Sequence, residues 1–213
     1  MSIKTAVVLF SGKGSNLENL LRNKSDLDNK LIYKAAFTNN SSAGGVNICK
    51  KYALSVSIAD DSDINASLLS FLKLHNPDLI ILSGYMKILP IKITERYKGK
   101  IINIHPSLLP KYPGLNTHKK VISNKDKLHG ASVHFVNEKM DEGPVIIQGI
   151  FKVNNETDSI KLKNNVHKVE YIIFPIAIRW FALDILKLED DSVSVNGIKI
   201  TKPIQYFIDD HNT

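Results

Sequence analysis

Short apolar runs recur along the first half of the chain, separated by stretches with helical periodicity. Four of the runs have little polar interruption, which is typical of strands buried on both faces, and a fifth is weaker. The predicted strands are Thr5–Phe10, Leu31–Phe37, Asp78–Ser83, Lys100–Ile104 and, more weakly, Ser55–Ile58. The helical patterns between them cover Asn16–Arg22, Gly45–Tyr52 and Asn65–Leu74. Alternating strands and helices predict a parallel, doubly wound sheet.

The second half of the chain has a different pattern. The segment Ala131–Val136 largely alternates between apolar and polar residues, and Val145–Phe151 follows a turn that contains Gly143 and Pro144. These two segments predict an added pair of strands. We therefore expect an α/β fold with a mostly parallel, Rossmann-like central sheet, flanking helices and added antiparallel strands in the C-terminal half.

A long helix is predicted from about Ser159 to Leu188, with a kink at Pro175. The most hydrophobic stretch of the chain lies within it, but charged residues interrupt that stretch, so it is expected to be a core helix and not a membrane span. The dipeptide Asn196-Gly197 between two short apolar runs is a strong signal for a type I′ hairpin.

Composition narrows the class of protein. A chain of 213 residues with 43% hydrophobic residues is expected to form one domain with a real core. The net charge is +7, but only three of the 28 cationic residues are arginines and the lysines are dispersed, so nucleic-acid binding is not expected. The single cysteine, Cys49, excludes an internal disulfide. With no secretory signal in the sequence, we expect a cytoplasmic protein.

A glycine-containing loop, Ser11-Gly-Lys-Gly-Ser-Asn16, stands between the first predicted strand and the first predicted helix. Doubly wound folds bind phosphate at this place. Ser15 and Glu18 have the spacing of a capping box. The loop completes neither the dinucleotide fingerprint nor a Walker A motif. An ordinary strand-to-helix turn and a phosphate monoester site both fit these residues.

Asn103 and His105 end the fourth of the clear strands. Side chains two residues apart on a strand share a face, and the carboxyl ends of parallel strands are where open α/β sheets bind ligands. A core histidine bonded to a backbone carbonyl is the alternative. The pair can supply an oxyanion donor and a proton carrier, which suits acyl transfer without a covalent enzyme intermediate. The stiff, proline-rich loop from Pro106 to Gly114 that follows suits the wall of a site.

Four motifs in this order resemble the phosphoribosylglycinamide formyltransferase family over nearly the whole chain. They are Ser11-Gly-Lys-Gly-Ser-Asn-Leu17, Gly84-Tyr-Met-Lys-Ile-Leu89, Asn103-Ile-His-Pro-Ser-Leu-Leu-Pro110 and Asp141-Glu-Gly-Pro-Val-Ile-Ile-Gln148. The resemblance implies an enzyme of purine biosynthesis that moves the formyl group of 10-formyltetrahydrofolate onto the amine of 5′-phosphoribosylglycinamide. It also implies one formyltransferase domain over residues 1–213, with a phosphate-binding half to about residue 100 and a catalytic and folate-binding half from about 101.

The resemblance further assigns roles to residues. Asn103, His105 and Asp141 are expected to be catalytic, with Asp141 raising the pKa of His105 and relaying protons. The ribonucleotide is expected to contact Gly14, Ser15, Asn16, His167 and Glu170. Folate contacts are expected from Met86, Lys87, Ile88, Leu89, Asn103, Asn137, Glu138, Lys139, Met140 and Asp141. No metal is expected, the partners are the two small substrates, and the assembly is a monomer or a homodimer.

The sequence departs from the family in two places. An arginine that often touches the folate is replaced near Asp63 by acidic residues, so one folate contact is not expected here. Asn116 stands where bacterial members commonly have histidine, with His118 close by.

Three other activities are alternatives. Formyltetrahydrofolate deformylase would let water attack in place of the amine, and it usually has an extra N-terminal domain, whereas this chain starts at the first predicted strand. Methionyl-tRNA formyltransferase has a further C-terminal domain, for which there is no room after Thr213. A nucleotide-binding module without catalysis would explain the glycine loop, but it would not explain Asn103, His105 and Asp141 together.

Overall fold

The computed structural model describes residues 2–27, 29–154 and 158–208. They form two compact units, the first ending at Asn103 and the second starting at Ile104. This division falls close to the boundary between the two predicted halves. That the halves form one domain stays a prediction.

The first unit is a parallel sheet with helices on both faces. Its strands are β1 (Lys4–Phe10), β2 (Leu31–Thr38), β3 (Val56–Ile58), β4 (Leu79–Leu82) and the start of β5 (Ile101–His105). Their order is β3-β2-β1-β4-β5, and every pair is parallel. The chain winds outward in both directions from β1 and β4, so the doubly wound sheet predicted from the alternating pattern is confirmed.

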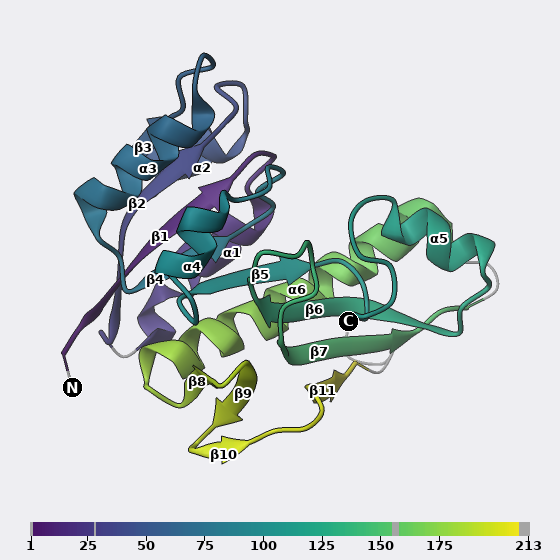
Figure 1. The fold of residues 1–213 in the computed structure, drawn as a ribbon. Helices are drawn as coiled ribbons and strands as arrows, with labels where there is room; N and C mark the ends of the chain where they lie inside the picture. Colours follow the sequence, from purple (N-terminus) through teal and green to yellow (C-terminus); the bar gives the residue numbers. More distant parts are fainter. Residues whose placement is uncertain (1, 28, 155–157, 209–213) are drawn as a thin grey trace. The chain divides into compact units, whose positions relative to one another are not determined.

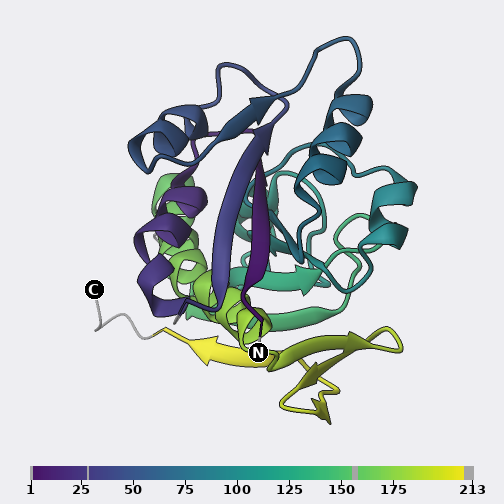
Figure 2. The same ribbon diagram turned by 90° about the vertical axis from the view of Figure 1, so that its left-hand side faces the viewer.

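The helices of this unit follow the predicted segments closely. Helices α1 (Ser15–Arg22) and α2 (Gly45–Lys51) lie against each other on one face, and α3 (Ile64–His75) packs against β2 on the other (Figure 2). A short 3-10 helix, η1 (Lys24–Leu27), follows α1. Helix α4 (Ile91–Arg96) was not predicted. The central strands are apolar because both faces are covered, and all four residues of β4 are buried.

The second unit is built on an antiparallel pair. Strand β6 (Leu128–Phe135) pairs with β7 (Val145–Lys152), and β11 (Ile204–Phe207) adds to β7 in parallel. The long helix α6 (Ser159–Ala182) packs across β6 and β7 (Figure 1). A short helix, α5 (Thr117–Ser123), precedes β6. The predicted antiparallel pair is confirmed, whereas α5 and β11 were not predicted.

The end of the long helix was predicted wrongly. Helix α6 continues through Pro175 but stops at Ala182, and Leu186–Glu189 forms strand β8. Asp184 has a φ of 59°, a left-handed conformation that ends the helix. Strand β8 joins β9 (Ser192–Val195) and β10 (Ile198–Lys199) in a second sheet, and Asn196 and Gly197 both have positive φ, as the type I′ turn requires.

None of the helices in the described part of the chain is long and apolar enough to cross a membrane. The longest, α6, buries one side against β6 and β7 and carries lysines along the rest of its first turns. Its hydrophobic residues therefore belong to the core of the second unit, as the charged interruptions in the sequence predict.

Close backbone contact between β6 and β7 depends on glycine, which yields a prediction for stability. A Cβ at Gly130 would lie 1.8 Å from the carbonyl oxygen of Gly149. We expect Gly130→Ala to lower the free energy of unfolding by about 1–3 kcal/mol because the strands must move apart. Gly12→Ala is the matched control, since a Cβ there meets nothing within 4 Å. Urea unfolding measures both, and equal stability of the two variants would contradict this account.

Candidate active site

The predicted phosphate loop starts at the point where the strand order of the first unit reverses. It follows β1, and the predicted folate segment follows the neighbouring β4. The Ser11 amide donates to the Gly84 carbonyl over 3.1 Å, and the Met86 amide donates to the Ser11 hydroxyl over 2.9 Å. The Ser11 hydroxyl in turn donates to Asn39 Oδ1. The two predicted segments are therefore joined at the crevice where this kind of sheet binds ligands.

Gly14 has a conformation and a packing that only glycine allows. Its φ is 81°, and a Cβ there would lie 2.6 Å from the Cα of Gly45 at the start of α2. Helix α1 begins directly after it at Ser15, and the N-terminus of a helix is a place where proteins bind anions. Glycine at position 14 therefore allows the chain to turn from β1 into α1 close to the start of α2.

The predicted capping box is absent. Gly14, and not Ser15, is the N-cap of α1, and no side chain caps the helix. Glu18 instead forms an ion pair with Lys51, with 2.7 Å between the carboxylate and the ammonium group. The prediction was wrong because α1 starts one residue earlier than the capping box requires, which leaves Ser15 inside the helix.

His105 and Asp141 lie in contact, although they are far apart in the sequence. His105 ends β5, and Asp141 comes from the turn between β6 and β7. The imidazole Nδ1 is 3.3 Å from Asp141 Oδ2, and both side chains are largely buried. Asn103 is two residues before His105 on β5, so the backbone alternation puts the two on the same side of the strand.

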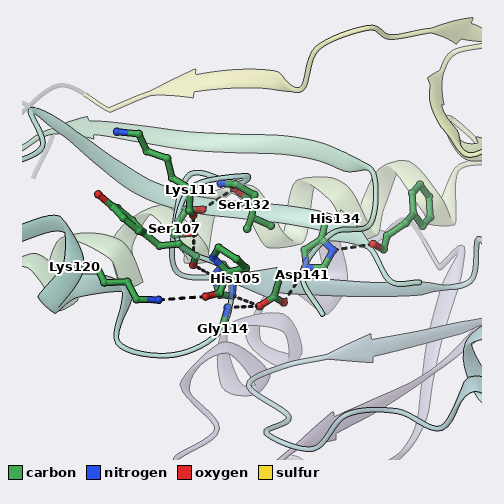
Figure 3. A network of polar contacts seen from close by, with 12 residues as sticks. His105, Ser107, Lys111, Gly114, Lys120, Ser132, His134 and Asp141 are labelled. Carbon is green, nitrogen blue, oxygen red and sulfur yellow. Dashed lines mark hydrogen bonds and ion pairs between the residues drawn. The ribbon is translucent and has the colours of Figure 1, made fainter. Parts of the chain in front are cut away.

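The carboxylate of Asp141 has further partners within the second unit. The Gly114 amide donates to Oδ2 over 2.8 Å, and His134 Nε2 lies 3.6 Å from Oδ1. Figure 3 shows Asp141 between His105 and His134. Burial by itself raises the pKa of Asp141, but the contact with His134, the Gly114 amide and the charge of the histidines outweigh burial and lower it to about 2. Asp141 is therefore an anion throughout the neutral range.

The pKa of His105 corrects an expectation from the sequence. Burial lowers it below the usual 6.5, while the hydrogen bond to the Tyr112 carbonyl and the charge of Asp141 act in the opposite direction without reversing it. The charge of Asp141 raises the pKa of His105, as the sequence predicts, but burial lowers this pKa by more. Sequence reasoning missed the depth at which His105 is buried, with 5% of its surface exposed.

Helix α6 brings His167 and Glu170 together. His167 Nδ1 lies 3.0 Å from Glu170 Oε2, and Glu170 is 4% exposed. The charge of Glu170 raises the pKa of both His105 and His118, although burial lowers both overall. A buried carboxylate facing histidines is not part of a solvated helix surface. The spacing of three residues was visible in the sequence, but the burial was not.

The residues predicted to hold folate are mostly accessible in the part of the chain that the structure describes. Met86, Lys87 and Ile88 are exposed, and Leu89 packs into the first unit. In the second unit, Glu138, Lys139 and Met140 are exposed, and Asn137 is half-buried and accepts the Lys139 amide. Exposed Met and Ile side chains suit packing against the face of a flat heteroaromatic ring such as a pterin.

Asp63, at the place of the missing family arginine, has a structural role. Its carboxylate accepts the Ala66 amide over 2.8 Å and caps the start of α3. An aspartate at the N-cap stabilises the start of a helix.

Sequence reasoning missed several polar residues close to His105 and Asp141. His118 Nδ1 lies 3.1 Å from His129 Nε2, and burial lowers the pKa of His129 to about 3. His134 Nδ1 donates to the Phe135 carbonyl over 2.8 Å. Burying a polar side chain in a strand costs free energy unless the side chain forms hydrogen bonds. That rule, applied to β6, could have found His129 and His134.

Other chemistries gain no support from the described residues. Burial raises the pKa of the Cys49 thiol to about 11, so this thiol is not activated as a nucleophile. A search of the described residues for three or more histidine, cysteine or acidic side chains that could hold a metal ion finds no such group.

Comparison with known proteins gives the family. The family model described as formyl transferase matches residues 4–178. Phosphoribosylglycinamide formyltransferase of Escherichia coli is 36% identical over 91% of this chain and 94% of its own length. The structure of phosphoribosylglycinamide formyltransferase from Coxiella burnetii superposes with a TM-score of 0.90 at 31% identity and covers 96% of this chain and 100% of that one.

The fold is shared more widely than the sequence. A formyltetrahydrofolate deformylase from Pseudomonas syringae has a TM-score of 0.84 at 24% identity, and the match covers 91% of this chain and 66% of that one. At that identity the likeness concerns the fold alone. The stronger likenesses extend over nearly the full length of both proteins, and they confirm the resemblance seen in the four motifs. The chain belongs to the formyl transferase family and, within it, to the phosphoribosylglycinamide formyltransferases.

Proposed function

We propose that this protein transfers the formyl group of 10-formyltetrahydrofolate to the amine of 5′-phosphoribosylglycinamide in purine biosynthesis. The observation that carries the proposal is the buried contact between His105 and the ionised Asp141 at the end of β5. Phosphoribosylglycinamide formyltransferases from other organisms match nearly the whole chain. A pair of this kind can hold and move a proton next to a reacting carbonyl.

In the proposed reaction the substrate amine attacks the formyl carbon, and the carbonyl oxygen becomes an oxyanion. Asn103 and His105 stabilise the oxyanion by donating hydrogen bonds. The bond between the formyl carbon and the folate nitrogen then breaks, and the proton lost by the amine ends on that nitrogen. Asp141 accepts the proton from the amine, directly or through water, and His105 delivers a proton to the leaving nitrogen.

Burial lowers the pKa of His105, whereas the hydrogen bond to the Tyr112 carbonyl and the charge of Asp141 raise it. The charges of Asp141 and Glu170 favour the imidazolium, so His105 can take up a proton during the reaction. Proton uptake is thus coupled to the arrival of the amine, which supplies the proton.

The substrate contacts follow from the same proposal. Gly14, Ser15 and Asn16 hold the 5′-phosphate on the N-terminus of α1, and His167 and Glu170 contact the ribonucleotide. Met86–Leu89 and Asn137–Asp141 contact the folate. The chain acts as a single domain in the cytoplasm, as a monomer or a homodimer, and it needs no metal.

The decisive experiment is a steady-state assay of the purified protein with both substrates. We expect tetrahydrofolate to form only when 5′-phosphoribosylglycinamide is present. Formate release that does not depend on the ribonucleotide would identify a deformylase. Ligand binding without turnover would identify a nucleotide-binding module.

Replacement of the histidine tests its chemical role. We expect His105→Asn to lower kcat by at least about 100-fold because the proton carrier is lost while a polar side chain remains. His75→Asn is the matched control, since His75 lies at the end of α3 in the first unit. Full activity of the His105 variant would contradict the proposal, and circular dichroism checks that both variants fold.

Replacement of the carboxylate tests the electrostatic coupling. The charge of Asp141 raises the pKa of His105, so Asp141→Asn should move this pKa to a still lower pH. With a pKa of about 2, Asp141 does not itself titrate between pH 4 and 9, a range chosen for that reason. NMR titration of the His105 ring measures the shift.

The neighbouring acid provides a control for this experiment. Glu142 has an exposed side chain and pairs with Lys139 over 3.7 Å. Glu142→Gln should leave the titration of His105 where it is in the unmodified protein. A pKa of His105 that is unchanged or higher in Asp141→Asn would show that the two side chains are not coupled.

A further inference from the structure

The loop after β5 is fastened to one face of β6 and β7 by two buried polar side chains. Ser132 on β6 and Gln148 on β7 stand opposite each other in the strand register, so their side chains share a face. The Ser132 hydroxyl donates to the Ser107 carbonyl over 2.7 Å and accepts from the Leu109 amide over 3.0 Å (Figure 3). Gln148 Nε2 donates to the Leu109 carbonyl over 2.7 Å and to the Ser132 hydroxyl over 2.9 Å. We call Ser132 and Gln148 the strand anchor.

The strand anchor depends on these two residue types. The single proton of the Ser132 hydroxyl goes to a carbonyl, so its oxygen accepts from both N–H groups that contact it. Gln148 Nε2 carries two hydrogens, and the two oxygen atoms that it contacts both accept. These bonds are away from water, because Ser132 is 0% exposed and Gln148 is 6% exposed. Loss of either side chain would leave a buried backbone group of Leu109 unpaired, which costs free energy.

The loop lies directly on β6. Gly130 is two residues before Ser132 on the same face of the strand, and a Cβ there would lie 3.0 Å from Leu108 Cδ2. His134 is two residues after Ser132, and its Nε2 lies 3.6 Å from Asp141 Oδ1. Three successive positions on one face of β6 therefore contact either the loop or the candidate catalytic carboxylate.

The far part of the loop contacts His105 and Asp141. The Tyr112 carbonyl oxygen lies 2.9 Å from His105 Nε2, and the Gly114 amide donates to Asp141 Oδ2 over 2.8 Å. Tyr112 comes three residues after Leu109 in the sequence. The strand anchor thus fixes the loop shortly before the first of these two contacts, so a displacement at Leu109 is passed on to both.

Two further bonds keep the loop in place when the strand anchor is lost. The Tyr112 hydroxyl donates to Asp126 Oδ2 over 2.8 Å, and the Ser107 hydroxyl donates to the Lys111 carbonyl over 2.6 Å. Neither bond involves Ser132 or Gln148. We therefore expect loss of the strand anchor to shift the loop and not to release it.

We propose that Ser132 and Gln148 are positioning residues for the transfer reaction, which hold the backbone of Leu109 and thereby keep the loop in contact with the catalytic pair. The proposal rests on the proposed function, since the pair is His105 and Asp141. The physical reason is that a proton carrier works only near its productive geometry, and a displacement of about 1 Å can cost about 100-fold in rate. Neither side chain is a predicted substrate contact, so both act through the loop.

The test is Gln148→Met, which keeps a long, unbranched side chain and removes both donors. We expect kcat to fall about tenfold, because the loop shifts while the substrates still bind. The KM of each substrate should stay within about twofold, because the loop contains none of the predicted substrate contacts. In the protein without substrates, the NMR resonance of the Gly114 amide proton should move upfield, because its bond to the ionised Asp141 lengthens.

Gln205→Met is the matched control. Gln205 on β11 is the neighbour of Gln148 in the same sheet, but its side chain is exposed and is not part of the strand anchor. We expect kcat and the Gly114 resonance of this variant to match those of the unmodified protein. A loss of stability by itself does not move a resonance of the folded state, so the resonance distinguishes positioning from a merely structural role.

Ser132→Ala is a second variant, which removes a single oxygen atom and gives a measurement even where Gln148→Met does not fold. We expect it to change kcat and the Gly114 resonance in the same direction. In the double variant kcat should be little lower than in the more impaired single variant, because both side chains act through the same backbone. Effects on kcat that multiply would contradict a shared anchor.

The outcomes separate the two proposals. A Gln148→Met protein whose kcat stays within about twofold of that of Gln205→Met, or whose Gly114 resonance does not move, overturns the positioning role. The NMR measurement does not depend on turnover. A moved resonance in a protein without transferase activity would therefore reject the proposed function and leave the hold of the strand anchor on the loop in place.

Discussion

The contact between His105 and Asp141 is the interaction on which the rest of the candidate site depends. Three polar groups of the second unit contact this pair: the Gly114 amide and His134 contact the carboxylate, and the Tyr112 carbonyl contacts the other nitrogen of the imidazole. A buried anion is stable only with such donors. The turn between β6 and β7 and the loop after β5 therefore have to be placed together.

Two opposing effects set the charge of the pair. Burial favours a neutral imidazole, and the nearby carboxylates favour the imidazolium. Asp141 stays ionised, and His105 has a lowered pKa but lies beside groups that stabilise an added proton. This combination suits a reaction in which a proton must be received and then passed on. The charge of the buried Glu170 on α6 also favours the imidazolium form of His105.

Local patterns in the sequence predicted what depends on neighbours in the chain. The apolar runs that became β1, β2 and β4, the turn at Asn196-Gly197 and the alternation that places Asn103 and His105 on one side of β5 all follow from spacing alone. Predictions at helix ends were less successful, because a residue such as Asp184 in a left-handed conformation ends a helix without a glycine or proline to signal it.

The amino-acid order by itself determined the parallel sheet, the glycine at the first turn, the residues that carry the candidate chemistry and, through four motifs, the family. Only the tertiary structure decided how deeply His105 is buried, which way its pKa moves, and which ring nitrogen faces Asp141. The physical reason is the sequence distance over which each effect acts. Backbone periodicity is set by adjacent residues, whereas the electric field and the hydrogen-bond partners at one imidazole are set by groups that the fold brings from β6, α6 and the loop after β5.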